Sequence, residues 1–198
     1  MEPINQPKFI IELQDIIESA KQIQETIAMS YGLLHQYTKE FIIPLIHQKG
    51  LTIATVELTT CGLISDLLTG SSGASHIFIL GMTPYSNEMK IKLGISREDL
   101  TFKGYGVASP EIAKQLAQRI RDYSGAKIGL AETGLITSSE LEKRRTEKKA
   151  GEVYTAITFN EDISVTKLSI QNGLKRREMR QEIAFRVLQF LESFLKEL

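Results

Sequence analysis

The sequence predicts an α/β fold in which helices cover a mixed β-sheet, with a helical segment at the N-terminus. Short runs of β-branched residues alternate with amphipathic segments along the chain, which is typical of layered α/β folds. Two late runs flank a short polar turn at Asn160 and predict an antiparallel hairpin, so the sheet combines parallel and antiparallel strands. The expected strands span residues 51–56, 76–82, 126–131, 151–159 and 163–170.

Helices are expected between and after these strands. Threonines that can cap a helix open the segment 59–69, and a proline opens the segment 84–93. Ser109 begins a further helix, and a last amphipathic helix covers 176–195. The polar segment 135–149 is expected to form a loop or a short helix.

The N-terminal region has helical periodicity. Apolar residues recur at spacings of three and four within 8–34, which predicts one amphipathic helix; its stripe comprises Ile10, Leu13, Ile17, Ala20, Ile23 and Ile27. A second helix is expected over 38–48, with Pro44 kinking it or marking its first turn and Gly50 ending it. We therefore divide the chain into a helical extension, 1–36, and a main domain, 37–198.

Composition excludes several classes of protein. The 198 residues contain 24 Lys and Arg against 24 Asp and Glu, so the net charge is zero and we expect no nucleic-acid partner. Cys61 is the single cysteine, which rules out an intrachain disulfide and a cysteine-rich zinc module. The three histidines lack metal-ligand spacing, so we expect neither a metal nor another cofactor. Without an apolar run of about 18 residues or a secretory signal, we expect no membrane association and a cytoplasmic location.

Six segments, taken in series, resemble the CinA C-terminal domain family, the nicotinamide-mononucleotide (NMN) amidohydrolases. V-E-L-T-T-C-G at 56–62 is similar to the family's A-E-S-C-T-G-G, and Y-S-N-E-M-K at 85–90 is similar to Y-S-N-E-x-K. G-V-A-S-P-E at 106–111 resembles G-A-V-S-x-E, and A-E-T-G at 131–134 resembles A-V-T-G. G-E-V-Y from Gly151 and R-R-E-M-R from Arg176 resemble G-T-V-W and the R-xx-I-R part of the last motif. The resemblance covers about residues 37–197.

The resemblance implies a three-layer α/β/α sandwich and hydrolysis of the NMN carboxamide to nicotinic acid mononucleotide and ammonia. The family uses a serine nucleophile with a tyrosine and a lysine beside it, which correspond here to Leu58, Tyr85 and Lys90. A lysine in a partly dry pocket can act as a base, and backbone N–H groups at a helix start can hold an oxyanion or a phosphate. By the same resemblance, the substrate-binding residues are Glu57, Thr60, Gly62, Asn87, Ser109, Thr133, Gly134 and Arg176.

The sequence departs from the family pattern at the reacting centre. Leu58 has no nucleophilic atom, and loss of a catalytic nucleophile can cost on the order of 10⁶ in rate. The family's glycine-rich loop is replaced by the polar segment after Gly134, and Lys175 replaces an acidic residue. The sequence thus predicts an amidohydrolase-family protein with lost or reduced NMN deamidase activity.

Two other functions remain open. The chain could be an active amidohydrolase with a relocated nucleophile, for which Thr59, Thr60 or a water activated by Lys90 is the candidate; Cys61 is a weaker one. It could also be a non-catalytic nucleotide-binding module, which needs an open pocket, or a purely structural interaction module, whose pocket should be filled, for example by Leu58. The partners expected are a nicotinamide nucleotide or a similar small phosphate ligand, and a second copy of the chain. The N-terminal stripe would pack on its own domain, on that copy or on another partner, and the basic runs 143–149 and 175–177 form solvated loops or bind an anion.

Overall fold

The sheet has five strands in the order β2-β1-β3-β4-β5. The computed structural model describes residues 30–101, 104–136, 152–170 and 174–198. β2, β1 and β3 are parallel, whereas the β3–β4 and β4–β5 pairs are antiparallel, so the predicted mixed sheet and terminal hairpin are confirmed. The strands are β1 (Ile53–Glu57), β2 (Phe78–Met82), β3 (Ile128–Leu135), β4 (Glu152–Phe159) and β5 (Asp162–Ser169).

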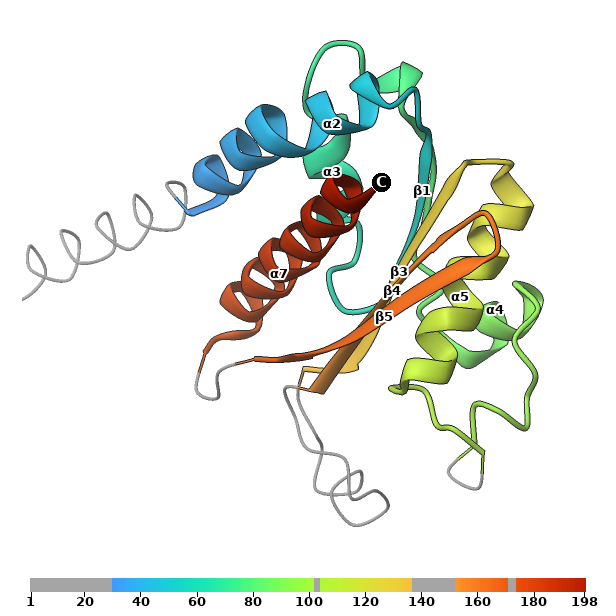
Figure 1. The fold of residues 1–198 in the computed structure, drawn as a ribbon. Helices are drawn as coiled ribbons and strands as arrows, with labels where there is room; N and C mark the ends of the chain where they lie inside the picture. Colours follow the sequence, from blue (N-terminus) through green and yellow to red (C-terminus); the bar gives the residue numbers. More distant parts are fainter. Residues whose placement is uncertain (1–29, 102–103, 137–151, 171–173) are drawn as a thin grey trace, which may run out of the picture.

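Helices cover both faces of this sheet, which confirms the three-layer arrangement (Figure 1). One face carries α2 (Ile43–Gln48), α3 (Leu63–Thr69) and α7 (Arg176–Glu197). The other face carries α4 (Asn87–Lys92) and α5 (Pro110–Ser124). Two separate apolar cores therefore hold the sheet between the helical layers.

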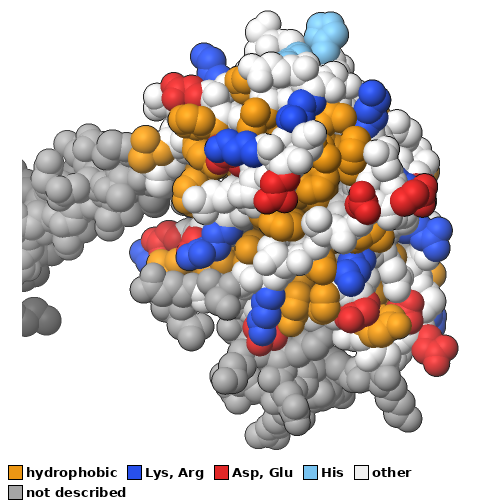
Figure 2. Space-filling view, in the orientation of Figure 1, with side chains coloured by type: hydrophobic (Ala, Val, Ile, Leu, Met, Phe, Trp, Pro, Cys, Tyr) orange, Lys and Arg blue, Asp and Glu red, His pale blue; other side chains and the backbone are white. Residues whose placement is uncertain are grey.

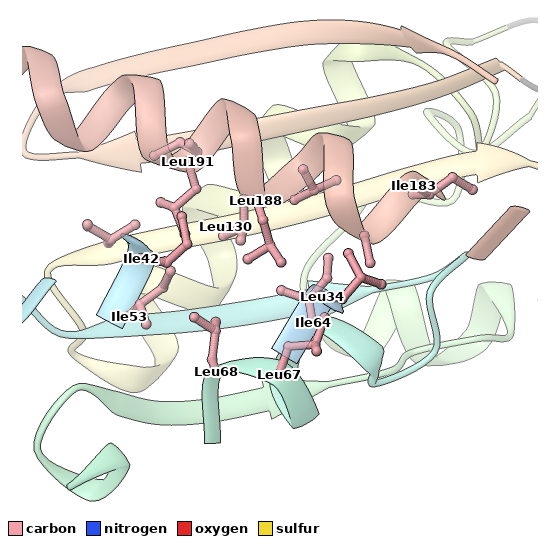
Figure 3. Close-up of a cluster of buried hydrophobic side chains, with 14 of the residues drawn as sticks. Leu34, Ile42, Ile53, Ile64, Leu67, Leu68, Leu130, Ile183, Leu188 and Leu191 are labelled. Carbon is pink, nitrogen blue, oxygen red and sulfur yellow. The ribbon is translucent and has the colours of Figure 1, made fainter. Parts of the chain in front are cut away.

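The larger core lies beneath α7. Ile183, Leu188 and Leu191 of this helix are buried at spacings that keep them on one side, where they face the sheet (Figure 3). Ile53 of β1 and Leu130 of β3 are buried opposite them. This packing places the first turn of α7 near the carboxyl ends of the central strands.

The second core is formed mainly by α5. Ser109 caps this helix as predicted, since its Oγ accepts the N–H of Ile112 at 3.3 Å. Gly129 in β3 has no room for a side chain, because a Cβ there would collide with the carbonyl oxygen of Ala117. The glycine lets α5 lie close against the centre of the sheet.

Three predicted element starts are corrected. The helix expected from residue 59 begins at Leu63, because residues 58–62 form a turn whose N–H groups bond to side chains of the sheet. The helix expected from Pro84 begins at Asn87, and the hydroxyl of Ser86 caps it by accepting the N–H of Met89. The strand expected from residue 76 begins at Phe78, since η2 (Ala74–His76) is a 3₁₀ turn.

The predicted break between two N-terminal helices is also wrong for the described residues. Residues 30–37 are α-helical and continue through a π-helical turn, η1 (Thr38–Ile42), into α2. Pro44 follows the widened turn in the first turn of α2, where its missing N–H is tolerated. The N–H of Ile43 bonds to Thr38 O, five residues back. The stripe from Ile10 to Ile27 and the basic run 143–149 lie outside the described residues.

The surface carries charges of both signs. Figure 2 shows basic, acidic and apolar side chains interspersed on one face, in keeping with the net charge of zero. Within the described part of the chain, no helix combines the length and the apolar character needed to cross a membrane.

Candidate functional site

A cleft of about 340 Å³ opens at the carboxyl ends of β1 and β3. This edge is the usual ligand site of α/β sheets, because the loops that leave the strands there build a crevice. The turn after β1, the start of α4, the loop before α5, the end of β3 and the start of α7 all contribute. The lining residues are Leu58, Thr59, Tyr85, Asn87, Lys90, Val107, Thr133, Gly134, Leu135, Ile136 and Arg176.

Most of the predicted site residues meet in this cleft. The structure brings onto its wall Leu58, Tyr85, Asn87, Lys90, Thr133, Gly134 and Arg176. The other predicted residues are not among the described residues that line it; they are Glu57, Thr60, Gly62 and Ser109. The cleft has two cationic side chains, and no Asp or Glu is among its described lining residues.

Lys90 is almost completely buried, with 5 % of its surface exposed. Its Nζ donates to Tyr85 O at 2.9 Å and lies 3.5 Å from Asn87 Oδ1, so both oxygen partners are uncharged. Burial lowers the pKa of the Lys90 amine, and the charge of nearby Glu88 opposes this shift. Burial therefore makes the Lys90 amine easier to deprotonate than an exposed lysine amine.

Replacing Lys90 by methionine should raise the free energy of unfolding by about 1 kcal/mol, because an apolar chain of similar length removes a poorly paired buried amine. The pKa of Lys90 in the folded protein lies below the unfolded value of 10.5. The wild type therefore becomes more stable as pH rises from the folded pKa towards 10.5. The difference in the free energy of unfolding between Lys90→Met and the wild type should therefore become smaller as pH rises. Urea unfolding at several pH values up to 10.5 measures it, and a pH-independent difference would contradict this explanation.

Tyr85 and Arg176 lie on opposite elements of the cleft. Arg176 Nη2, on the first turn of α7, donates to Tyr85 Oη at 3.2 Å. Tyr85 is 61 % exposed, so it does not pack beneath α4. Asn87 does not cap that helix, because Ser86 does. Both side chains instead belong to the polar wall of the cleft.

Leu58, which the resemblance matches to the family's serine, lies on the cleft wall. It is 8 % exposed and packs with the α5 core. The cleft remains open beside it, so Leu58 does not fill the pocket as expected for a purely structural module. Its side chain contributes only carbon atoms to the cleft wall.

Glu57 fixes the turn that follows Leu58. This carboxylate is 1 % exposed and accepts the backbone N–H groups of Gly62, Ile64 and Ser65 at 2.7–3.0 Å. Its bonds also include the hydroxyl of Ser65. Glu57 therefore holds the start of α3 from inside the protein and does not face the cleft.

Glu132 is a second buried carboxylate and the register partner of Glu57 on β3. Its Oε1 accepts the N–H groups of Thr59 and Thr60 at 2.8 and 2.9 Å, and its Oε2 accepts the Thr59 hydroxyl. Complete burial raises the pKa of this carboxyl, although these hydrogen bonds oppose the shift. The N–H groups of Thr59 and Thr60 are thus already bonded within the protein, so these two groups are not offered to a ligand as the helix start was expected to do.

The candidates for a relocated nucleophile are constrained in the same way. Thr59 lines the cleft, but its hydroxyl donates to Glu132. The Thr60 hydroxyl lies 2.7 Å from Glu57 and 2.8 Å from Glu132. Cys61 has a φ of 54° and receives a contact from Arg180 Nη2 at 3.3 Å, away from the lining residues.

A matched pair of substitutions tests the role of Glu132. Glutamine should be tolerated, because both backbone N–H groups bond to one oxygen and the Thr59 hydroxyl can accept from the new amide. Valine should lower the free energy of unfolding by about 2–4 kcal/mol, because it leaves both N–H groups unpaired.

The pH dependence distinguishes the glutamine variant from the wild type. The folded pKa of Glu132 lies above its unfolded value of 4.5, so its contribution to stability is present at low pH and is lost as pH rises through the folded pKa. Glu132→Gln should therefore gain stability relative to the wild type above pH 4.5. Denaturant unfolding between pH 4 and 8 measures this difference, and a constant difference would argue against a raised pKa.

Ser109 is not among the described lining residues of the cleft and instead caps α5. It is buried, and its Oγ donates to Gly106 O at 3.0 Å. Ser109→Ala should lower the free energy of unfolding by about 1 kcal/mol, as expected for loss of an N-cap. Thermal unfolding checks this, and an unchanged midpoint would show that the cap is dispensable.

Glu132, Val107, Leu135 and Ile136 shape the site but were not predicted from the sequence. A signal for Glu132 was present, because a charged residue replaces valine of the A-V-T-G pattern within a buried strand. Its partners became apparent only with the register of β1 and β3. Among the described residues, no group of three His, Cys, Asp or Glu side chains could hold a metal ion.

Comparison with known proteins identifies the family to which the chain belongs. The model of the CinA C-terminal domain matches residues 35–195. A CinA-like protein of Kosmotoga olearia is 33 % identical over 177 residues, covering 88 % of this chain and 41 % of the relative. A putative competence-damage inducible protein of Caldanaerobacter subterraneus is 34 % identical, covering 83 % of this chain and 39 % of the relative. The chain thus spans about two fifths of the length of these curated relatives.

Solved structures show the same fold. A competence-damaged protein (CinA) superfamily protein of Klebsiella pneumoniae aligns with a TM-score of 0.75 at 19 % identity, covering 83 % of this chain and 99 % of that one. A competence/damage inducible protein of Agrobacterium tumefaciens aligns with a TM-score of 0.69 at 26 % identity, covering 82 % and 93 %. On the family match and these relatives, the chain belongs to the CinA C-terminal domain family.

Proposed function

We propose that this chain binds a nicotinamide nucleotide, or a similar small phosphate ligand, and hydrolyses its amide slowly or not at all. The observation that carries the proposal is an open cleft that keeps two cations, Lys90 and Arg176, beside a leucine at the nucleophile position. Two basic side chains among the described lining residues favour an anionic ligand, and the apolar lining residues favour a ring.

The absence of a hydroxyl at Leu58 argues for slow amide hydrolysis. A serine there would supply the attacking oxygen, and its loss costs on the order of 10⁶ in rate when nothing replaces it. The N–H groups of Thr59 and Thr60 that could stabilise the resulting oxyanion are bonded to Glu132. Loss of one such donor typically costs about 10²–10³ in rate.

One observation favours the second candidate function, an active amidohydrolase with a relocated nucleophile. Thr59 lines the cleft, and its hydroxyl contacts the carboxylate of Glu132, which could accept its proton. Thr59→Val removes the hydroxyl while keeping the shape of the side chain. Ammonia release that disappears in this variant would support the second function.

Calorimetric titration with NMN tests the proposed binding. Arg176→Gln should weaken binding at least about tenfold, because it removes a charged donor from the cleft. Arg177→Gln is the matched control, because Arg177 is exposed on the same helical turn but does not line the cleft. Saturable binding that only Arg176→Gln weakens supports the proposal, whereas no saturable binding, or equal loss in both variants, overturns it.

A further inference from the structure

All three histidines of the chain lie at one end of the molecule. His35 is on the helical segment 30–37, His47 on α2 and His76 in η2. The rings of His47 and His76 are 6.5 Å apart between centroids, and Figure 2 shows histidine side chains at the top of the face it displays. Because α2 and η2 lead into β1 and β2, this end lies at the amino-terminal starts of these strands. The cleft lies at the opposite edge, at the carboxyl ends of β1 and β3.

A second cavity, of about 480 Å³, opens at this end between the helical run 35–47 and the loop that follows α3. None of its described lining residues also lines the cleft. The basic and hydroxyl side chains on its wall belong to His35, Lys39, His47, Ser71 and Ser72.

The loop approaches the histidines closely because two of its residues are glycines. A Cβ at Gly70 would collide with the imidazole of His35, so a side chain there would displace the ring. A Cβ at Gly73 would lie 3.8 Å from Nε2 of His47. The two imidazoles therefore lie against one short loop, although they come from different turns of the helical run.

The same loop carries an unsatisfied hydroxyl. Ser71 Oγ is buried and has no hydrogen-bond partner among the described residues. A buried polar group without a partner is unfavourable, so this hydroxyl gains from any acceptor that it can reach. Rotation about the Cα–Cβ bond is sufficient to turn it towards the cavity that Ser71 lines.

The charged side chains on the cavity wall are basic. Lys39 is cationic at neutral pH, and a histidine ordinarily gains a positive charge as pH falls between 8 and 5. Two further basic residues lie at the same end outside the described wall: Lys49, exposed at the end of α2, and His76, exposed in η2.

The acids on the surrounding elements have other partners. Glu40 of η1 accepts from Gln36 at 3.0 Å. Asp66 of α3 accepts the hydroxyl of Tyr31. Glu192 of α7, the helix that packs against η1 and α2, forms an ion pair within its own helix. None of these carboxylates is among the described residues of the cavity wall, so the wall favours an anion.

We propose that this cavity is a second binding site, separate from the cleft, for a phosphate group. Lys39 supplies a charged donor, His35 and His47 supply ring N–H groups, and Ser71 supplies a hydroxyl. Phosphate oxygens accept from all of these donors. The cavity is large enough for a small ligand, so the phosphate is either free or part of a small ester such as a sugar phosphate.

NMR titration of the full chain tests the proposed site. Because the three histidines all lie at this end, their ring signals report on the cavity and not on the cleft. The probes are orthophosphate and ribose 5-phosphate, added at constant ionic strength and pH 6. We expect saturable shifts of the His35 and His47 signals. Tighter binding of ribose 5-phosphate identifies an ester as the ligand, whereas equal affinities show that the phosphate group alone is recognised.

Substitutions at exposed positions identify the groups that bind. Lys39→Gln should weaken phosphate binding about two- to fivefold, because it removes one exposed cation from the wall. Lys49→Gln is the matched control, since Lys49 is exposed at the same end but is not a described lining residue. His47→Gln should weaken binding more at pH 6 than at pH 8, because the imidazole ordinarily changes its charge between these values. Comparison with the wild type at each pH cancels the titration of phosphate itself.

Three results would overturn the site. Signals that do not shift, or that shift without saturation, would show that phosphate does not bind in the cavity. Equal weakening by Lys39→Gln and Lys49→Gln would show that only the general charge of this end is recognised. Loss of the shifts in Arg176→Gln would place the phosphate in the cleft. The proposed function of the cleft stands or falls separately, because its test uses Arg176 and NMN.

Discussion

Replacing Glu57 by alanine should lower the free energy of unfolding by about 3–5 kcal/mol, the largest stability effect expected in this chain. The carboxylate is buried and accepts N–H groups of Gly62, Ile64 and Ser65, together with the hydroxyls of Thr60 and Ser65. Alanine leaves the three backbone N–H groups without this acceptor, whereas the hydroxyls of Thr60 and Ser65 still contact Glu132 and Thr55. Since domains are stable by only about 5–15 kcal/mol, the variant should unfold at low denaturant concentration.

Glutamine at this position should not rescue stability, in contrast to Glu132. Oε2 of Glu57 accepts the N–H groups of Gly62 and Ile64, and Oε1 accepts that of Ser65. Either orientation of a glutamine amide therefore faces an N–H group with its own NH₂. Urea unfolding of Glu57→Ala and Glu57→Gln measures both effects, with Glu161→Ala in the exposed hairpin turn as control. A loss below about 1 kcal/mol in Glu57→Ala would contradict the proposed role of this carboxylate.

Introducing serine at Leu58 should yield little activity unless Glu132 is replaced as well. Leu58→Ser supplies a hydroxyl, but the N–H groups of Thr59 and Thr60 remain bonded to Glu132. Leu58→Ser combined with Glu132→Val frees these donors. Ammonia release from NMN should then exceed that of Leu58→Ser at least about 10²-fold, since one oxyanion donor is worth about 10²–10³ in rate.

The matched control for this experiment is Leu58→Ser combined with Glu132→Gln. Glutamine keeps an oxygen on both N–H groups, so this variant should remain as slow as Leu58→Ser alone. Circular dichroism establishes that each variant is folded before its rate is compared. Equal rates in the valine and glutamine combinations would show that the donors bonded to Glu132 do not limit the reaction.

Much of the fold and part of the site could be predicted from the sequence. The alternation of strands and helices and the hairpin at Asn160 depend on local sequence patterns, so the sequence alone predicts them. Tyr85, Asn87 and Lys90 lie within one short motif and reach the cleft together on α4 and the residues before it. Their meeting with Arg176 followed only from the resemblance, because 91 residues separate Tyr85 from Arg176.

What could not be predicted depends on contacts across the sheet. The register between β1 and β3 places Glu57 beside Glu132, and these side chains replace the threonine capping expected at residue 59. Similarly, the helix that ends in α2 continues through Pro44 because a π-helical turn accommodates it. Local sequence patterns identify where a proline or a cap is allowed, but they do not say which distant group satisfies the backbone.

On the proposed function, the cleft binds its ligand but does not hydrolyse the amide at an appreciable rate. The most direct test is a single-turnover experiment with the protein in excess over NMN, in which ammonia and nicotinic acid mononucleotide are measured over time. We expect NMN to be recovered intact, with any slow release unaffected by Thr59→Val. Conversion of the bound NMN to nicotinic acid mononucleotide within minutes, abolished by Thr59→Val or Lys90→Met, would contradict the claim and establish a working active site.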